Sequence, residues 1–186
     1  SSALNDSTTA MSAGDVSING ISIGASVAAS DTASFANKDA SAISKAAAIN
    51  NVSDRTGVTA VVNTNTVDNT AAQTNAGSVT VAGSINGVAW TTLTSTTDAS
   101  VNRQSFVDAV NAISDQTGVT AIDTGELGTT SGGGVQFVAE DGRNISINFT
   151  TVASATEVGA RANAANGVAD TFTGEFTLQS DKEISV

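Results

Sequence analysis

Residues 49–60 read INNVSDRTGVTA, and residues 110–121 read VNAISDQTGVTA. Eight of the twelve positions are identical, and two more exchange Ile for Val. An Asn-Gly pair flanked by apolar residues precedes each copy. A repeat of this length indicates one supersecondary unit that is built twice along the chain.

The Asn-Gly pairs, Asn19-Gly20 and Asn86-Gly87, predict how each unit begins. A type I′ turn needs positive φ at both central residues, and Asn followed by Gly tolerates this best. We therefore expect a β-hairpin at the start of each unit.

Apolar residues recur at helical spacing between each hairpin and the repeated block. This spacing predicts one helix over about 40–55 and another over about 102–116. Asn37 or Asp39 is the expected N-cap of the first helix, because either side chain can accept a hydrogen bond from a free backbone N–H.

Gly57 and Gly118 follow the last periodic turn of these helices. A left-handed residue often ends a helix, and Gly adopts that conformation because it has no Cβ to clash. The alternating residues that follow predict strands at about 57–62 and 118–122. Each unit is thus expected to run from a hairpin through a helix and a glycine stop to a strand.

The order Ile-Asn-Gly, a helix with an Ile-Asn or Val-Asn step, and Thr-Gly-Val-Thr-Ala resembles the repeat in the outer domains of bacterial flagellins. It also resembles some hook-associated and filament-cap proteins, and it covers roughly residues 14–62 and 77–149. The resemblance implies an extracellular, surface-exposed and antigenic part of a flagellar filament subunit, with neighbouring flagellin subunits as partners. The alternative is a binding or adhesion module of a hook-associated or cap protein that contacts host receptors or glycans.

The fold class expected from these signals is α+β, with two hairpin–helix–strand modules that form antiparallel sheets. The modules are 14–76 and 77–149, and a short leading segment, 1–13, precedes them. An Asn- and Thr-rich stretch, 63–77, has no periodicity and separates the modules. Residues 150–186 are expected to form a short helix and a returning β-hairpin.

Three further elements are expected in the second half of the chain. Apolar residues alternate on both sides of the acidic turn 140–143 and predict a third hairpin over 135–149. A weak helix is expected over 155–165 and a last hairpin over 172–186. The glycine-rich stretch 125–134 is expected to be a flexible link.

The composition excludes several classes of function. The 186 residues include seven Lys and Arg against eighteen Asp and Glu, a net charge of −11. Nucleic acids and anionic membrane surfaces require clustered basic residues, and no apolar run approaches the ~20 residues of a transmembrane helix. Without His or Cys there is no Ser-His-Asp triad, Cys-His pair or His-ligated zinc. Mutual repulsion favours an isolated chain that stays monomeric.

Paired carboxylates are the remaining catalytic possibility, because glycoside hydrolysis needs only two of them. The candidates are Glu126, Glu140, Asp141 and Glu157. Acidic residues before a glycine are also typical of a turn, and we favour that interpretation. Trp90 is expected to pack on a sheet rather than to bind sugar. We predict no enzyme, no cofactor and no metal.

The resemblance also implies O-glycosylation, with the Thr-rich loops 63–77 and 91–100 as candidate sites. Thr is equally suited to strands and polar loops, so composition leaves both interpretations open. Four Asn-x-Ser/Thr sequences occur, at Asn5, Asn51, Asn144 and Asn148.

Overall fold

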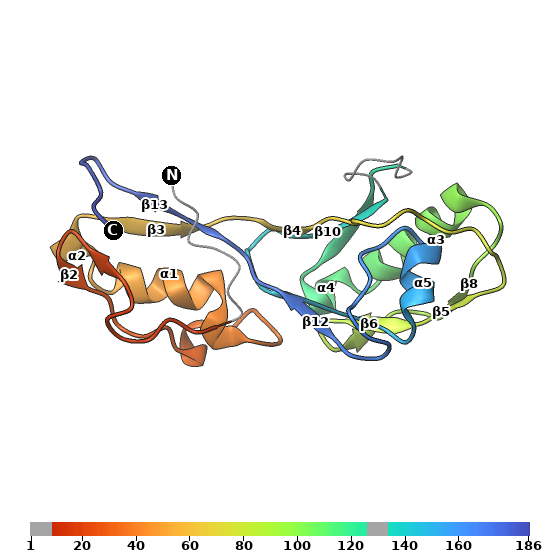
Figure 1. The fold of residues 1–186 in the computed structure, drawn as a ribbon, viewed down its shortest axis with the longest axis horizontal. Helices are drawn as coiled ribbons and strands as arrows, with labels where there is room; N and C mark the ends of the chain where they lie inside the picture. The colour runs from red at the N-terminus through yellow and green to blue at the C-terminus, as the bar shows by residue number, and fades with distance from the viewer. Residues whose placement is uncertain (1–8, 126–133) are drawn as a thin grey trace. The chain divides into compact units, whose positions relative to one another are not determined.

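The structure is a computed structural model that describes residues 9–125 and 134–186 (Figure 1). The chain is α+β, with small antiparallel sheets, which confirms the predicted fold class. It forms two compact units. Unit 1 contains the described residues up to Asn65 with Glu140–Asn144 and Phe172–Val186, and unit 2 contains Thr66–Ala139 and Ile145–Thr171.

Unit 1 is built from two short antiparallel pairs of strands and a helical segment. The first pair is β1 with β2, and the second is β3 with β13. The elements are β1 (Ser17–Ile18), β2 (Ile21–Ser22), the 3-10 helices η1 (Ala28–Ser30) and η2 (Lys38–Ala40), α1 (Ala42–Asn50), α2 (Ser53–Thr56), β3 (Thr59–Val62) and β13 (Phe176–Gln179).

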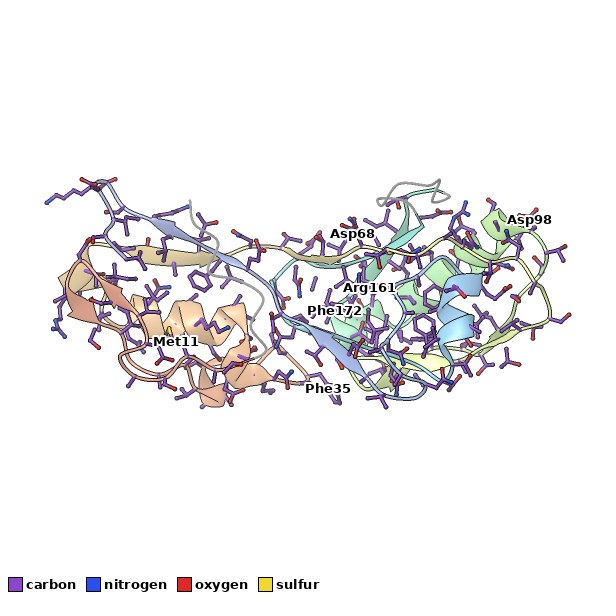
Figure 2. All side chains as sticks on the ribbon, viewed as in Figure 1. Met11, Phe35, Asp68, Asp98, Arg161 and Phe172 are labelled. Atoms are coloured by element: carbon purple, nitrogen blue, oxygen red, sulfur yellow. The ribbon has the colours of Figure 1, made fainter. Side chains whose placement is uncertain are left out.

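The core of unit 1 consists mostly of small side chains. Ile18, Ile49 and Val58 are fully buried in it, and Phe176 is its one aromatic residue. Met11 belongs to this core although it falls in the expected leading segment, and it is labelled in Figure 2. The whole cluster is Met11, Ile18, Ile23, Ala42, Ala46, Ala48, Ile49, Val58, Ala60 and Phe176.

Unit 2 contains a four-stranded sheet ordered β12-β11-β6-β7, a three-stranded sheet ordered β4-β10-β9, and the pair β5-β8. One residue at an end of β4 and one at an end of β12 fall in unit 1. The elements are β4 (Asn65–Val67), β5 (Thr80–Val81), β6 (Gly83–Ile85), β7 (Val88–Ala89), β8 (Leu93–Thr94), α3 (Ala99–Asn111), α4 (Ser114–Thr117), β9 (Thr120–Asp123), β10 (Val135–Ala139), β11 (Ile145–Phe149), α5 (Val152–Glu157) and β12 (Asp170–Phe172).

Aromatic rings dominate the core of unit 2. The ring of Trp90 lies edge-on to Phe106 at 5.2 Å and against Phe149 at 5.0 Å, and Phe106 also meets Phe137 edge-on. Trp90 is only 3% exposed, so the prediction that it packs on a sheet is confirmed. Its ring covers Gly83, where an added Cβ would come within 2.5 Å of the indole.

Each predicted helix is interrupted near its end, so the expectation of one continuous helix per module is wrong. Residues 42–50 and 53–56 form separate helices, α1 and α2, and α3 and α4 repeat this division. Val52 and Ile113 lie at the breaks with φ of −122° and −114°. The backbone N–H of each turns to the carbonyl three residues earlier, which tightens the turn and ends the α-helical ladder.

The caps of the two long helices differ from the expectation as well. The side chain of Ser41 accepts a hydrogen bond from the Ser44 N–H and caps α1. Asn37 lies before η2 in a left-handed conformation and its side chain caps nothing, and Asp39 lies within η2. In unit 2 the Asp98 carboxylate caps α3, which therefore begins earlier than predicted.

Two expected hairpins are wrong, because their strands pair elsewhere. The β10 strand pairs with β9, whereas β11 pairs with β6 in another sheet. The turn between them belongs to unit 1, where the Asn144 N–H donates to the Ser34 hydroxyl over 2.9 Å. The β13 strand likewise pairs with β3, and Ile184 packs against the core of unit 1 instead of returning along β13.

The remaining boundaries shift by smaller amounts. The expected helix over 155–165 is α5, which begins at Val152 and ends before Gly159, where φ is +64°. Most of the expected glycine link, 126–133, lies outside the described residues. The division between units falls after Asn65, inside the predicted separating stretch, but each unit is discontinuous in sequence, unlike the expected modules.

Candidate functional site: the two asparagine locks

The first candidate site is the turn of the β1–β2 hairpin. Asn19 and Gly20 have φ of 50° and 76°, so both residues have the positive φ that a type I′ turn requires. The Asn19 side-chain amide donates to the carbonyl oxygen of Thr56 over 2.8 Å, at the end of α2. Its backbone N–H donates to the Ser185 carbonyl, and the Ser185 N–H returns a bond to Asn19 Oδ1, both at 2.9 Å. We call this arrangement an asparagine lock.

Unit 2 contains a second asparagine lock with the same atoms in the same roles. Asn86 and Gly87 have φ of 48° and 79°. The Asn86 side-chain amide donates to the carbonyl of Thr117 over 2.9 Å. The Asn86 N–H donates to the Ser146 carbonyl, and the Ser146 N–H donates to Asn86 Oδ1, again both at 2.9 Å. A single asparagine thus joins a hairpin, a helix end and a distant extended segment in each unit.

The helix ends that receive these bonds are also alike. Gly57 and Gly118 both have φ of 68° and ψ of 18°. Each donates its N–H to the serine carbonyl at the start of the preceding short helix over 2.7 Å. The left-handed helix stop inferred from the sequence is therefore present in both units, and it leaves the carbonyl of the preceding threonine available to the asparagine.

A second asparagine in each block escaped the sequence reasoning. Asn50 receives the Ala60 N–H at 2.7 Å and donates to the Ala60 carbonyl at 2.9 Å. Asn111 makes the same two bonds to Ala121, at 2.8 and 3.0 Å. Each side-chain amide thus pairs with the N–H and the C=O of one strand residue, as the backbone of a neighbouring strand would. The identity of this asparagine in both copies of the repeated block was the available signal.

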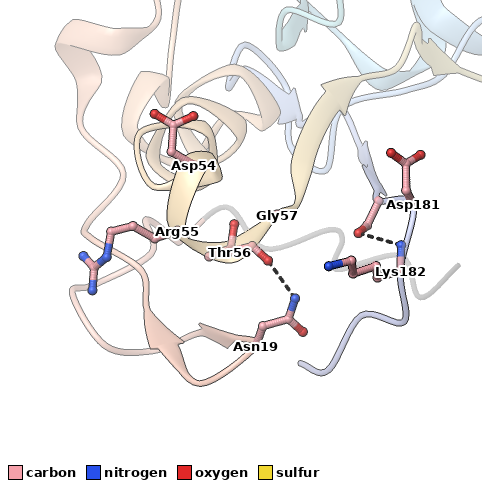
Figure 3. A pocket seen from close by; sticks show the side chains of 8 residues that line it. Asn19, Asp54, Arg55, Thr56, Gly57, Asp181 and Lys182 are labelled. Atoms are coloured by element: carbon pink, nitrogen blue, oxygen red, sulfur yellow. Dashed lines mark hydrogen bonds between the residues drawn. The ribbon is translucent and has the colours of Figure 1, made fainter.

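A hollow of about 400 Å³ lies beside the asparagine lock of unit 1 (Figure 3). Its charged side chains are all exposed: Asp54, Arg55, Asp181 and Lys182. Charges of both signs and the backbone near Gly57 can hydrogen-bond a small polar molecule. Because those side chains stay in contact with water, their Coulomb interactions are screened and weak. Asn19, Thr56, Gly57 and Ser180 complete the lining.

The carboxylates considered for catalysis do not gather into one site among the described residues. Glu140 is exposed, and Asp141 is held by Arg143, whose guanidinium lies 2.6 Å from its carboxylate. Glu157 belongs to unit 2, whereas Glu140 and Asp141 belong to unit 1. Glu126 lies outside the described residues. Asp141 thus serves the turn, in line with the interpretation favoured from sequence.

Glu157 holds together the loop that precedes β5. Its carboxylate accepts hydrogen bonds from the Thr74 hydroxyl at 2.8 Å, the Ala76 N–H at 2.9 Å and the Gly77 N–H at 3.3 Å. Burial alone would raise the pKa of Glu157, but these hydrogen bonds together lower it below its ordinary value. The side chain is 2% exposed. The buried, ionised carboxylate of Glu157 therefore fixes residues 74–77 by hydrogen bonds.

An ion pair in unit 2 between the buried Arg103 and the half-buried Asp123 also escaped the sequence reasoning. The Arg103 Nε donates to Asp123 over 2.7 Å, and its terminal nitrogen donates to Gln73 over 2.8 Å. Gln73 lies in the Asn- and Thr-rich stretch and also donates to the Glu157 carbonyl at 2.9 Å. That stretch is therefore bonded into unit 2 at this point, which its lack of periodicity did not indicate.

The N-glycosylation sequences differ in accessibility. Asn51 is exposed, whereas Asn144 is fully buried and donates to the carbonyls of Ala36 and Asn37. Asn148 is half-buried in β11. Asn51 is thus the most accessible of the three, and Asn5 lies outside the described residues.

No protein-family model matches this sequence, and no curated protein matches it. Within residues 9–125 and 134–186, no group of three or more His, Cys, Asp or Glu side chains is placed to hold a metal ion. The described helices are all too short or too polar to cross a bilayer.

Proposed function

We propose that this chain is the surface-exposed outer part of a bacterial flagellar filament subunit, with a structural role. The observation that carries the proposal is the pair of asparagine locks. In each lock the asparagine of the Asn-Gly pair bonds to the first threonine of the Thr-Gly-Val-Thr-Ala motif. These are the two motifs on which the resemblance to flagellins rests. Asn19 and Asn86 bond to Thr56 and Thr117 with nearly equal lengths, so the repeated motif encodes one repeated piece of geometry.

The path of the chain supports this proposal. The first hairpin and residues 184–186 both belong to unit 1. Between them the chain passes from unit 1 into unit 2 and back twice. Asn19 and Ser185 are joined by two hydrogen bonds, so the first hairpin and the segment around Ser185 lie side by side within unit 1. A path that leaves unit 1 for unit 2 and returns to unit 1 suits an outer domain of a filament subunit.

The charge of the chain fits the same role. Its net charge is −11, and the exposed surface is rich in Ser, Thr and Asn. A strongly acidic surface keeps densely packed copies hydrated and discourages unspecific association at high local concentration. The partners in this role are neighbouring subunits of the filament.

Labelled antibody fragments test the proposal directly. Fragments raised against the isolated chain are applied to intact cells of the source bacterium and viewed by electron microscopy. We expect regular decoration along the whole length of the flagellar filaments. Decoration confined to the filament tip or the hook junction would favour the cap or hook-associated alternative. Unlabelled flagella on cells that make the protein would refute both.

A further inference from the structure

The strands β3 and β9 occupy equivalent places in the repeat, and in the described part of the chain each pairs with a strand on one side only. On its other side an antiparallel strand presents the N–H and C=O of every second residue. In β3 these residues are Ala60 and Val62, because Asn63 donates its N–H to the Glu175 carbonyl on the paired side. A strand edge of this kind is a template for a further strand.

One asparagine side chain occupies this edge in each unit. Asn50 exchanges two hydrogen bonds with Ala60, at 2.7 and 2.9 Å. Asn111 exchanges two with Ala121, at 2.8 and 3.0 Å. Each asparagine is the last residue of its helix, α1 or α3. Its amide therefore takes the hydrogen-bonding positions that the backbone of an added strand would need.

The need to satisfy backbone hydrogen bonds does not by itself explain these contacts. Asn50 and Asn111 are both exposed, so water reaches their positions and could bond to the same strand groups. A hydrogen bond that replaces one to water has only a modest net effect on stability. What the asparagine does and water does not is exclude another polypeptide from the edge.

Exposed apolar side chains beside the occupied positions make the two strands prone to association. Val61 follows Ala60 and is 45% exposed, and Ile122 follows Ala121 and is 47% exposed. Both are β-branched residues, which favour strands. The β3 strand, Thr-Ala-Val-Val, also carries no charged residue. Strands with these properties pair readily with other chains when an edge is accessible.

We propose that Asn50 and Asn111 close the edges of β3 and β9 against strand addition by a second copy of this chain. A second copy is the partner because every copy brings the same strands, and two like edges can pair about a two-fold axis. Because β3 belongs to unit 1 and β9 to unit 2, a chain with both edges open would have two such sites. The two asparagines thus prevent open-ended assembly through strands, whatever the role of the chain in a filament.

Single and double substitutions test the proposal through the size of the assembly. Asn50→Ala and Asn111→Ala each open one edge, so each single variant should form a dimer of about twice 18.3 kDa as its concentration rises. The double variant has two open edges and should form longer chains. Light scattering measures the mass. The fluorescence of Trp90 and slow exchange of the bonded Asn63 amide report that unit 2 and unit 1 stay folded.

Asn51→Ala is the matched control, because Asn51 is an exposed asparagine next to Asn50. It should remain a monomer, as should the wild type. Hydrogen exchange measured by NMR locates the contact. In Asn111→Ala the Ala121 amide should exchange fast in dilute solution and more than about tenfold more slowly in the dimer, because bonded amides exchange only when the strand opens. In the wild type its exchange should not depend on concentration.

Single variants that stay monomeric at every concentration would overturn the proposal, because the edges would then remain closed without the asparagines. Association that accompanies loss of the Trp90 or Asn63 signal would also overturn it, because unfolding and not an open edge would be the cause. A folded Asn111→Ala dimer in which the Ala121 amide still exchanges fast would place the contact elsewhere on the chain, with the same consequence.

Discussion

The side-chain amide of Asn86 and the carbonyl oxygen of Thr117 are joined by a hydrogen bond of 2.9 Å, as Asn19 and Thr56 are at 2.8 Å. The last carbonyls of a helix have no donor within the helix. In each unit an asparagine in a turn supplies that donor. Local turn chemistry and tertiary packing are thus fixed by the same residue.

Replacing the lock asparagines should destabilise the two units unequally. Asn86→Ala removes the hydrogen bonds that the Asn86 side chain makes to the Ser146 N–H and the Thr117 carbonyl in a buried site, and it places alanine at positive φ. Unpaired buried groups cost about 1–3 kcal/mol, so we expect a loss of ~3 kcal/mol in the free energy of unfolding. Asn19→Ala should cost about 1 kcal/mol, because Asn19 is exposed and water can replace its bonds.

Urea unfolding of unit 2 can be followed by the fluorescence of Trp90, the only tryptophan of the chain. Asn86→Gly is the matched control, because it keeps the positive φ and removes only the side-chain bonds. It should lie between the wild type and Asn86→Ala. Equal stability of all three would mean that the asparagine lock contributes nothing.

The glycine stops should each resist substitution. Gly57 and Gly118 have φ of 68°, a region where a side chain strains the backbone. A Cβ on Gly57 would meet no atom within 4 Å, so the loss there reports backbone strain alone. We expect Gly57→Ala and Gly118→Ala each to lower the free energy of unfolding by about 1 kcal/mol.

Gly24 provides the control for this pair, because a Cβ there also meets nothing within 4 Å and its φ is not in the left-handed region. Gly24→Ala should change stability by less than about 0.5 kcal/mol. Amide hydrogen exchange of residues next to each site measures the effect unit by unit. A neutral Gly57→Ala would refute the helix-stop interpretation.

Glu157 should make the stability of unit 2 depend on pH. Its pKa in the folded chain lies below the ordinary value of 4.5. Stability from its ionised form is therefore fully present above pH 4.5 and is lost as the pH falls through the folded pKa. Glu157→Gln should destabilise unit 2 by ~1–3 kcal/mol at pH 7, since charge-assisted bonds from Thr74, Ala76 and Gly77 are weakened.

The difference between Glu157→Gln and wild type should shrink as the pH is lowered from 7 toward 3, as measured by urea midpoints from Trp90 fluorescence. Glu140→Gln is the control, because Glu140 is exposed. It should change stability at pH 7 by less than about 0.5 kcal/mol. A constant difference between Glu157→Gln and wild type over this range would show that the ionised carboxylate is not what stabilises the loop.

The isolated chain should remain a monomer in solution. Its charge of −11 repels other copies, and this repulsion acts over about 10 Å at 0.1 M salt. Light scattering should give a mass near 18.3 kDa. Filaments or a defined oligomer at moderate salt would contradict the expectation and would place an assembly interface within the chain itself.

The features that the sequence predicts well are those with a local cause. The positive φ of Asn19 and Gly57 follows from the conformations that Asn and Gly tolerate, and each was recognised from a few neighbouring residues. The burial of Trp90 follows in the same way from its place just after a turn. Local propensity and tertiary packing agree at these positions.

The features that sequence reasoning missed depend on distant partners. Ser146 and Ser185 close the two locks from far along the chain, and nothing near them in sequence indicates that role. The strands on either side of the turn at Glu140–Asn144 looked like a hairpin, because alternation reports which face is buried and not which strand is the partner. The break at Val52 preserves the apolar spacing of the helix and was therefore invisible in the pattern.

One unit, closed by one asparagine, is built twice in this chain. NMR can detect scalar coupling across a hydrogen bond, between the side-chain nitrogen of each lock asparagine and the carbonyl carbon that accepts its bond. We expect two such couplings, from Asn19 to Thr56 and from Asn86 to Thr117. A coupling at Asn86 alone, or at neither asparagine under conditions where backbone couplings are resolved, would contradict it.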